Sequence, residues 1–242
     1  MTKTFEALGI PFPLFAAPVT QARGYINQGQ CTVCNSSAEH CFRLGIGCFV
    51  VVPCSHCNTA VGLDADDRVS GTCPECGVTV PFPKAEGNIT TCYSCLRQGR
   101  AAIGKDSAFG MISWQQAMEG VTHGAPELEA QGYELIDKGD DWYGVRLPKE
   151  LMLELLRTPS YVTWQGDVWQ FCCGAPMSFI GEWSKADFNN AAQDGAGRAL
   201  FAQVMSEDAL MVWDRNDLGE GSYCYVFRCP GCKALKAHMD MS

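Results

Sequence analysis

The first half of the chain contains eight cysteines that are grouped in four pairs of the form C-x-x-C. The pairs are Cys31/Cys34, Cys54/Cys57, Cys73/Cys76 and Cys92/Cys95. A C-x-x-C turn can place both sulfurs on one side, so that one pair acts as a bidentate ligand. Two pairs then complete a tetrahedral shell of four thiolates, which is typical of a structural zinc ion. The eight cysteines therefore predict two zinc sites.

The spacing of the pairs leaves open which of them share a metal. The inner pairs form the pattern C-x2-C-x15-C-x2-C, and with Pro74 and Gly77 this pattern is typical of a zinc ribbon. If the inner pairs share one zinc, the outer pairs share the other and the two sites are nested. Sequential pairing leaves gaps of 19 and 15 residues, which are also acceptable, and a crossed pairing is a third arrangement.

Structural zinc fits these cysteines better than other thiolate chemistry. Iron–sulfur clusters use the same ligands, but evenly paired cysteines without a close third one favour zinc. A redox-active site needs only one C-x-x-C pair. A catalytic zinc keeps an open position and commonly uses histidine or carboxylate ligands, whereas His56 lies between two cysteines and His40 and His123 have no partner pattern. We therefore expect closed sites and no enzymatic activity.

A fifth pair, Cys229/Cys232, lies far from the others in the sequence and needs further ligands. The obvious donors for a third zinc are Cys172 and Cys173. Adjacent residues of a strand point to opposite sides, so we do not expect both of them to bind one metal. The alternative ligands are Cys224 and His238.

The composition indicates a cytoplasmic protein with an acidic surface. The 27 Asp and Glu outnumber the 18 Lys and Arg, and residues 31–100 contain no basic stripe, so a macromolecular partner is expected to be basic and not a nucleic acid. The start of the chain lacks the apolar core of a signal peptide, and no apolar stretch is long enough to cross a bilayer. We therefore expect a reducing compartment, metal ligation instead of disulfides, and Cys41 and Cys48 as buried thiols.

The pattern of elements predicts an α+β fold, with a nested zinc-ribbon or knuckle region followed by antiparallel sheets and helices. The expected parts are an extended, proline-punctuated arm at 1–30, a zinc-binding cysteine-rich domain at 31–97 and an α+β domain at 98–242. Helical patterns lie at 113–120, 149–158 and 185–206. Strand patterns lie at 48–52, 78–82 and 134–147, with hairpins predicted around 174–176 and between 209–213 and 223–228.

Four segments of the chain resemble the CbrC family of bacterial proteins, which is also catalogued as uncharacterised. They are FPLFAAPVTQARGYI (12–26), CYSCLRQGRAA (92–102), RTPSYVTWQGDVWQFCCGAPMSFIG (157–181) and YVFRCPGCKALKAHMD (225–240). Shorter members of the family carry pairs similar to Cys31/Cys34 and Cys92/Cys95 that are much closer together. The resemblance therefore implies that residues 54–76 form an inserted ribbon, and it favours the nested arrangement.

The CbrC family is linked to tolerance of a DNase-type colicin, and relatives are found beside polymorphic toxin genes. The resemblance thus implies an immunity-like protein that binds and neutralises a basic protein toxin without turnover. One alternative is a zinc-ribbon protein that binds nucleic acid or acts in transcription. Another is a hydrolase at residues 139–183 that uses Asp140, Asp141 or a zinc ion at Cys173, Cys229 and Cys232, although the sequence contains no motif of that kind.

Overall fold

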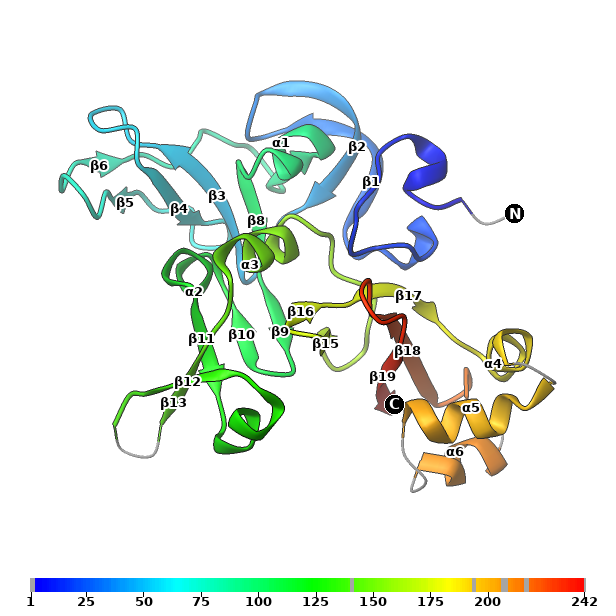
Figure 1. The fold of residues 1–242 in the computed structure, drawn as a ribbon. Coiled ribbons are helices and arrows are strands. Elements are labelled where there is room, and N and C mark those ends of the chain that lie inside the picture. The colour runs from blue at the N-terminus through cyan, green and yellow to red at the C-terminus, as the bar shows by residue number, and fades with distance from the viewer. Residues whose placement is uncertain (1–2, 140–141, 193–194, 206–208, 216–217, 242) are drawn as a thin grey trace. The chain divides into compact units, whose positions relative to one another are not determined.

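The chain forms two compact units. A computed structural model describes residues 3–139, 142–192, 195–205, 209–215 and 218–241 (Figure 1). Unit 1 consists of Met1–Gln21 and Tyr161–Ser242, and unit 2 consists of Ala22–Ser160. Both contain small antiparallel sheets and short helices, which confirms the predicted α+β class. Whether residues 31–97 fold as a domain of their own stays a prediction.

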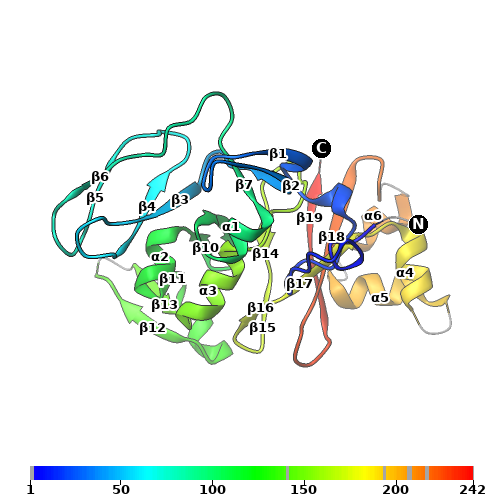
Figure 2. The ribbon, with the colours of Figure 1, turned by 90° about the horizontal axis from the view of Figure 1, so that it is seen from above.

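Unit 2 is built mainly from short antiparallel strands. They are β1 (Tyr25–Cys31), β2 (Ser36–Arg43), β3 (Cys48–Pro53), β4 (Ala60–Asp64), β5 (Gly71–Thr72), β6 (Thr79–Val80), β7 (Thr90–Cys92), β8 (Ala101–Ile103), β9 (Lys105–Ser107), β10 (Gly110–Ile112), β11 (Val121–Gly124), β12 (Glu134–Asp137) and β13 (Tyr143–Arg146). They form sheets with the orders β1-β2-β7, β4-β3-β8 and β11-β13-β12, together with the hairpins β5-β6 and β9-β10. In Figures 1 and 2 the β5-β6 hairpin lies beyond β4, away from the helix that follows β7.

The strand predictions for unit 2 are confirmed in part. The predicted strand 48–52 is β3, whose residues Val50 and Val51 are buried. The strand predicted within 134–147 is confirmed as β13, and the same stretch also contains β12, which pairs with β13 in an antiparallel hairpin. The chain turns at Gly139, which has a φ of 80°, a left-handed conformation that glycine adopts at little cost.

The helices of unit 2 begin and end at residues that favour helix boundaries. They are α1 (Tyr93–Arg97), α2 (Trp114–Glu119), α3 (Lys149–Leu156) and the 3₁₀ helix η3 (Pro126–Gln131). Ser113 and Gln116 form a capping box at the start of α2, and Gly120 ends it with a φ of 71°. The helix α3 follows Pro148 and buries Met152 and Leu155. The predicted helices at 113–120 and 149–158 are confirmed.

Unit 1 combines one three-stranded sheet with three α-helices. Its elements are η1 (Glu6–Leu8), η2 (Val19–Gln21), β14 (Val168–Trp169), β15 (Phe171–Cys172), β16 (Ala175–Pro176), β17 (Ser178–Glu182), α4 (Lys185–Ala191), α5 (Gly197–Val204), α6 (Leu210–Arg215), β18 (Ser222–Arg228) and β19 (Leu235–Met241). The sheet has the order β17-β18-β19, and both ribbon views show α4, α5 and α6 gathered beside it (Figure 2). Phe188, Phe201 and Trp213 of these helices pack with Cys224 and Val226 of β18 in one apolar cluster.

The amino-terminal segment belongs to the core of unit 1. The N–H of Ala16 donates to the carbonyl of Phe179 at 2.8 Å, and the N–H of Phe179 donates to the carbonyl of Leu14 at 2.9 Å. The rings of Phe15 and Phe179 are 5.2 Å apart, and Phe179 in turn stacks on the buried Tyr161 at 4.6 Å. The aromatic side chains Tyr161, Trp169, Phe171 and Phe179 are therefore part of the core.

Two local predictions in unit 1 are corrected by the structure. Residues 209–213 do not form a hairpin strand, because 210–215 form α6, which buries Val212 and Trp213 against the apolar cluster. The strand β18 pairs with β17 and β19 instead. The turn predicted at 174–176 lies at Cys173 and Gly174, while Ala175–Pro176 form β16.

Candidate metal centres

The structure brings twelve cysteines together in three groups of four. Centre A consists of Cys31, Cys34, Cys92 and Cys95; centre B of Cys54, Cys57, Cys73 and Cys76; and centre C of Cys172, Cys173, Cys229 and Cys232. Within each group the sulfur atoms all lie within 4.8 Å of one another. Centres A and B have the nested arrangement, which confirms that prediction. The five C-x-x-C pairs and the adjacent cysteines Cys172 and Cys173 all belong to these centres, whereas the alternative ligand Cys224 does not.

Four of the five C-x-x-C pairs form the same turn, which we call a cysteine knuckle. The residue directly after the second cysteine is left-handed in each: Asn35 (φ 55°), Asn58 (φ 63°), Gly77 (φ 72°) and Lys233 (φ 64°). In the Cys54 knuckle the N–H of Cys54 donates to the carbonyl of Thr59 at 2.8 Å, and the N–H of Asn58 donates to the carbonyl of Cys54 at 2.9 Å. The same two bonds recur in the knuckles that begin at Cys73 and Cys229, and Cys31 pairs with Ser36 between β1 and β2.

The left-handed residue explains how a knuckle presents two ligands. It reverses the chain immediately after the second cysteine, so that both sulfurs remain on one side of the turn. Glycine and asparagine adopt this conformation more readily than other residues. The sequence analysis used Gly77 in this way, but Asn35 and Asn58 were equivalent signals that it missed.

The pair Cys92/Cys95 is held differently, at the start of helix α1. Cys92 is the N-cap residue, with φ −79° and ψ 162°, and its sulfur accepts a hydrogen bond from the N–H of Cys95 at 3.5 Å. The N–H of Cys92 donates to the sulfur of Cys31 at 3.2 Å. In centre A a helix start therefore faces a knuckle, and backbone N–H groups donate to two of the sulfurs.

Centre C contains both of the adjacent cysteines, contrary to the expectation that their side chains diverge. Cys172 is the last residue of β15, whereas Cys173 has a φ of 52° and leaves the extended conformation. The two sulfurs consequently lie 3.8 Å apart, and Cys172 lies 3.6 Å from Cys232. The alternation rule fails here because Cys173 is part of the turn and not of the strand.

The alternative ligands for centre C lie elsewhere. Cys224 is fully buried in the apolar cluster beneath α4–α6, where burial raises the pKa of its thiol to about 12. The Nε2 atom of His238 lies 3.1 Å from a carboxylate oxygen of Asp240. The proposed use of Cys224 or His238 at this centre is therefore wrong.

The sulfur positions fit a tetrahedral shell and not disulfide bonds. A metal–sulfur bond of about 2.3 Å places the sulfurs of a tetrahedron about 3.8 Å apart. In centre B, Cys54 and Cys76, Cys57 and Cys73, and Cys57 and Cys76 are each separated by 3.5 Å. A disulfide would need about 2.05 Å, and all fifteen cysteines are free. Each centre can thus hold one metal ion, and four sulfurs leave no coordination position open.

The pKa shifts at the centres differ from one thiol to the next. Burial raises the pKa of Cys95, whereas hydrogen bonds lower that of Cys57 and so favour the thiolate that binds metals. The hydroxyl of Thr59 lies 3.2 Å from the sulfur of Cys57 and lowers the pKa of this thiol to about 6, since it can donate to a thiolate. At centre A, Nη1 of Arg100 donates to the sulfur of Cys95 at 3.7 Å, and its Nη2 donates to the carbonyl of Val33 at 3.0 Å. This guanidinium offsets part of the negative charge of four thiolates.

Cys41 shows the opposite behaviour although it lies beside centre A. Burial, followed by the charges of Cys31 and Cys92, raises the pKa of Cys41 to about 11. Its sulfur contacts the carbonyls of Ala38 at 3.4 Å and Gly29 at 3.7 Å, to which a neutral thiol can donate. Cys41 and Cys48 are both buried and lie outside the three groups, as predicted.

The three centres differ in how far solvent reaches their ligands. Three of the four cysteines of centre A are buried, while in centre B Cys57 is exposed. In centre C only Cys229 is buried, and both Cys173 and Cys232 are exposed. Solvent, chelators and oxidants therefore reach centre C most easily.

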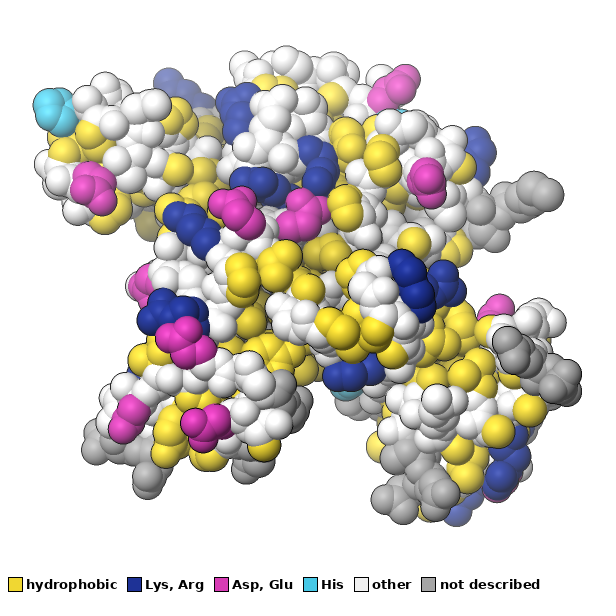
Figure 3. Space-filling model, in the orientation of Figure 1, with side chains coloured by type: hydrophobic (Ala, Val, Ile, Leu, Met, Phe, Trp, Pro, Cys, Tyr) yellow, Lys and Arg dark blue, Asp and Glu magenta, His cyan; other side chains and the backbone are white. Residues whose placement is uncertain are grey.

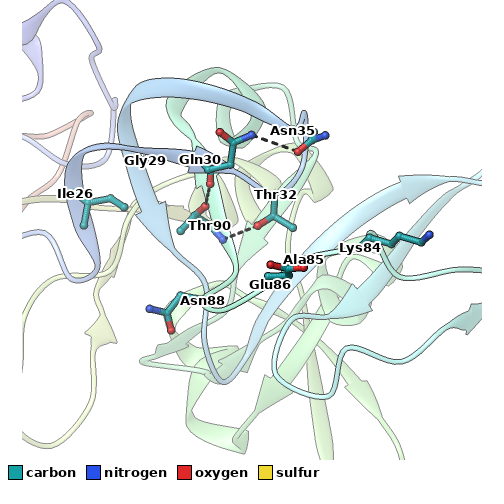
Figure 4. Close-up of a pocket in the computed structure, with 10 residues that line it drawn as sticks. All are labelled: Ile26, Gly29, Gln30, Thr32, Asn35, Lys84, Ala85, Glu86, Asn88 and Thr90. Carbon is teal, nitrogen blue, oxygen red and sulfur yellow. Dashed lines mark hydrogen bonds between the residues drawn. The ribbon is translucent and has the colours of Figure 1, made fainter.

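A polar pocket lies beside centre A in unit 2 (Figure 4). Its volume is about 640 Å³, and its lining consists of Ile26, Gly29, Gln30, Thr32, Asn35, Lys84, Ala85, Glu86, Asn88 and Thr90. Several of these groups bond to one another: Nε2 of Gln30 donates to Asn35 Oδ1 at 3.3 Å, and the N–H of Thr90 donates to Thr32 Oγ1 at 3.1 Å. The lining contains one carboxylate, Glu86, one ammonium group, Lys84, and no cysteine or histidine.

The residues proposed for a hydrolase fall into two sets. Asp140 and Asp141 lie outside the described residues. Cys173, Cys229 and Cys232 lie in centre C, where Cys172 supplies a fourth sulfur and closes the shell.

Among the described helices none is long and apolar enough to cross a membrane.

The fold and the three centres define an α+β protein whose cysteine groups are suited to holding structural metal ions. The chain belongs to a family described as "Uncharacterised protein family (UPF0167)", whose family model matches residues 11–241. No curated protein and no solved structure matches the chain.

Proposed function

We propose that the protein binds zinc at its three centres and uses the resulting rigid scaffold to bind and neutralise a basic protein toxin of the nuclease type. The observation that carries this proposal is that each centre is a closed group of four sulfurs. A metal held in this way contributes to folding and offers no position for substrate. The protein then acts through contact and not through turnover.

The donor set supports zinc as the metal. Four thiolates in a tetrahedron suit zinc or iron, whereas magnesium and calcium prefer oxygen ligands. Structural zinc sites commonly join two C-x-x-C knuckles, which is how centre B is built from Cys54/Cys57 and Cys73/Cys76. Centre C repeats one such knuckle at Cys229/Cys232.

The charge of the chain supports a basic partner. The formal net charge is −9 with all cysteines counted as neutral, and each zinc ion with four thiolates adds about −2. On the face drawn in Figure 3, basic side chains alternate with acidic ones around α1 and α3, where Arg97 pairs with Glu154 at 2.8 Å. A net negative charge accelerates encounter with a cationic protein and disfavours nucleic acid.

The resemblance to the CbrC family supports the toxin class, because that family is linked to tolerance of a DNase-type colicin. The test is co-expression of the chain with each toxin encoded beside its gene, followed by cell survival and co-purification. We expect survival and a stable complex with one of them. A Cys54→Ser variant should lose protection, while Cys41→Ser, which alters a buried cysteine outside the centres, should keep it.

Absence of both protection and complex formation with every such toxin would refute the proposal. A fluorescence titration with single- and double-stranded DNA and RNA at low salt examines the nucleic-acid alternative. Tight binding that weakens steeply as salt is added would favour that alternative.

A further inference from the structure

A short loop of unit 1, residues 162–166, holds a tryptophan in solvent. Trp164 is 70% exposed, and Val162 in the same loop is 51% exposed. Large aromatic side chains are normally placed in the core, as Trp169 is in this unit. An exposed tryptophan in a fixed position therefore points to a role at an interface.

The loop is held in place by a fully buried carboxylate. One oxygen of Asp240, Oδ2, accepts hydrogen bonds from the hydroxyl of Thr163, from the N–H of Trp164 at 2.9 Å and from the N–H of Gln165 at 3.1 Å. The side chain of Gln165 also donates to the carbonyl of Met241 at 2.5 Å. A buried carboxylate is costly unless its hydrogen bonds are satisfied, and here three of them determine the backbone that carries Trp164.

The indole ring has one packed face and one free face. Trp164 stacks on Tyr223 of β18, with ring centroids 6.0 Å apart and an angle of 30° between the planes. Among the described residues this is the one ring contact that Trp164 makes. Met241, at the end of β19, is 60% exposed. Val162, two positions before Trp164, is the other exposed apolar side chain of this loop. Met241 follows Asp240 on β19, so its side chain lies on the other face of the sheet from Tyr223.

We propose that this surface, formed by Val162, Trp164 and Tyr223, docks an arginine or lysine side chain of the basic partner. The face of a tryptophan ring attracts a cation more strongly than other aromatic rings do. The apolar side chain of Val162 can cover part of the methylene stem of such a side chain. The acidic charge of the chain favours this cation and disfavours a nucleobase that carries phosphate. This inference rests on the proposed function for the nature of the partner.

The chain also contains a cation–π contact between two of its own side chains. The ammonium group of Lys185 lies 5.3 Å from the centre of the Trp213 ring. Trp213 is mostly buried in the apolar cluster, so its cation comes from its own chain. Trp164 lies in solvent, and we infer that its cation comes from another molecule.

The test uses the full chain, a hexa-arginine amide peptide and its neutral isostere, hexa-citrulline amide. Affinity is measured by calorimetry, and the indole N–H signals are followed by NMR. We expect the arginine peptide to shift the Trp164 signal and the citrulline peptide to leave it in place. Trp164→Ala should weaken binding by about tenfold or more. Trp142→Ala is the matched control, since Trp142 is 67% exposed in unit 2, and it should change affinity by less than about twofold.

A second variant tests the positioning role of Asp240. Asp240→Asn retains the shape of the side chain but weakens the hydrogen bonds to the loop, so it should lower the affinity while Trp164 remains present. Unchanged affinity of Trp164→Ala, or equal binding of both peptides, would overturn the inference. A shift of the Trp164 signal with a short RNA and not with the arginine peptide would also overturn it.

The toxin measurements separate this inference from the proposed function. If a neighbouring toxin is bound and Trp164→Ala binds it as tightly as the native chain, the docking inference is wrong and the proposed function stands. If the arginine peptide binds at Trp164 but no toxin is bound or neutralised, the docking surface stands and the proposed function is lost.

Discussion

The sulfur atoms of Cys54 and Cys76 lie 3.5 Å apart, although 22 positions separate these residues in the sequence. This contact joins the end of the β3–β4 hairpin to the two-residue strands β5 and β6. The apolar side chains that support it are few, chiefly Val61, Leu63 and Val80. Each contributes about 2 kcal/mol, whereas ordering each residue costs about 1–2 kcal/mol for the backbone alone. We therefore expect the ribbon around centre B to need a bound metal ion in order to stay folded.

The first prediction concerns metal content. Protein purified under reducing conditions should contain three zinc ions per chain, measured by elemental mass spectrometry. On addition of a chelator, the ion of centre C should leave first, because Cys173 and Cys232 are exposed. Thiol labelling followed by peptide mapping identifies the centre that opens. Earlier labelling of Cys31 or Cys92 would contradict this order.

The second prediction compares two buried cysteines of unit 2. Cys54→Ser should remove one zinc and lower the free energy of unfolding by more than about 3 kcal/mol, since metal binding at such a site is coupled to folding. Cys41→Ser should keep all the zinc and cost about 1 kcal/mol, because a hydroxyl can replace the thiol beside the carbonyls of Ala38 and Gly29. Urea unfolding with parallel metal analysis gives both quantities. Equal zinc content in the two variants would show that Cys54 is no ligand.

The third prediction concerns the left-handed residues of the knuckles. A Cβ at Gly77 would meet nothing within 4 Å, so Gly77→Ala changes only the cost of a φ of 72°, and it should destabilise by about 1 kcal/mol. Lys233→Gly should instead stabilise the protein, by about 1 kcal/mol, because Lys233 has a φ of 64° that glycine adopts at less cost. Urea unfolding of the two variants measures this pair of effects. Destabilisation by Lys233→Gly would mean that the hydrogen bond from Lys233 Nζ to Pro230 outweighs the backbone term.

The fourth prediction concerns pH. Burial, and then the charge of Asp187, raise the pKa of Glu182 in the folded chain. The folded state thus binds a proton more tightly than the unfolded state, whose glutamate has a pKa of about 4.3. The stability linked to this proton is complete below about pH 4.3 and is lost as the pH rises through the folded pKa.

Glu182→Gln removes this loss, so the variant should be more stable than the native chain at pH 7. The difference should shrink as the pH falls towards about 5, and unfolding curves at both values measure it. Asp187→Asn removes the neighbouring charge and should therefore raise the stability at pH 7 by part of the same amount. This gain is offset because the substitution weakens the capping box that Asp187 forms with Ser184 at the start of α4. A Glu182→Gln variant that is less stable at pH 7 would show that the charged carboxylate is favourable in its native position.

Much of the site could be predicted because cysteine pairs report local geometry. Each C-x-x-C motif makes its own turn, and the pairing of Cys31/Cys34 with Cys92/Cys95 followed from the resemblance to shorter proteins. The position of the Cys173 side chain could not be predicted from such local geometry. Cys172 ends strand β15 and Cys173 is left-handed, so the two side chains do not diverge as strand alternation predicts. Short elements such as α6 were also ambiguous, because six residues support a strand pattern and a helix pattern equally well.

By itself the sequence determined the knuckles, the helices at 114–119 and 149–156, and the acidic charge, because these depend on neighbouring residues or on composition. Tertiary structure decided that Cys172 and Cys173 both join Cys229/Cys232, that Cys224 joins an apolar cluster and not a centre, and that Trp164 stands in solvent on a loop held by Asp240. The physical reason is distance along the chain. Trp164 and Asp240 are 76 positions apart, and only the packing of unit 1 brings such residues into contact.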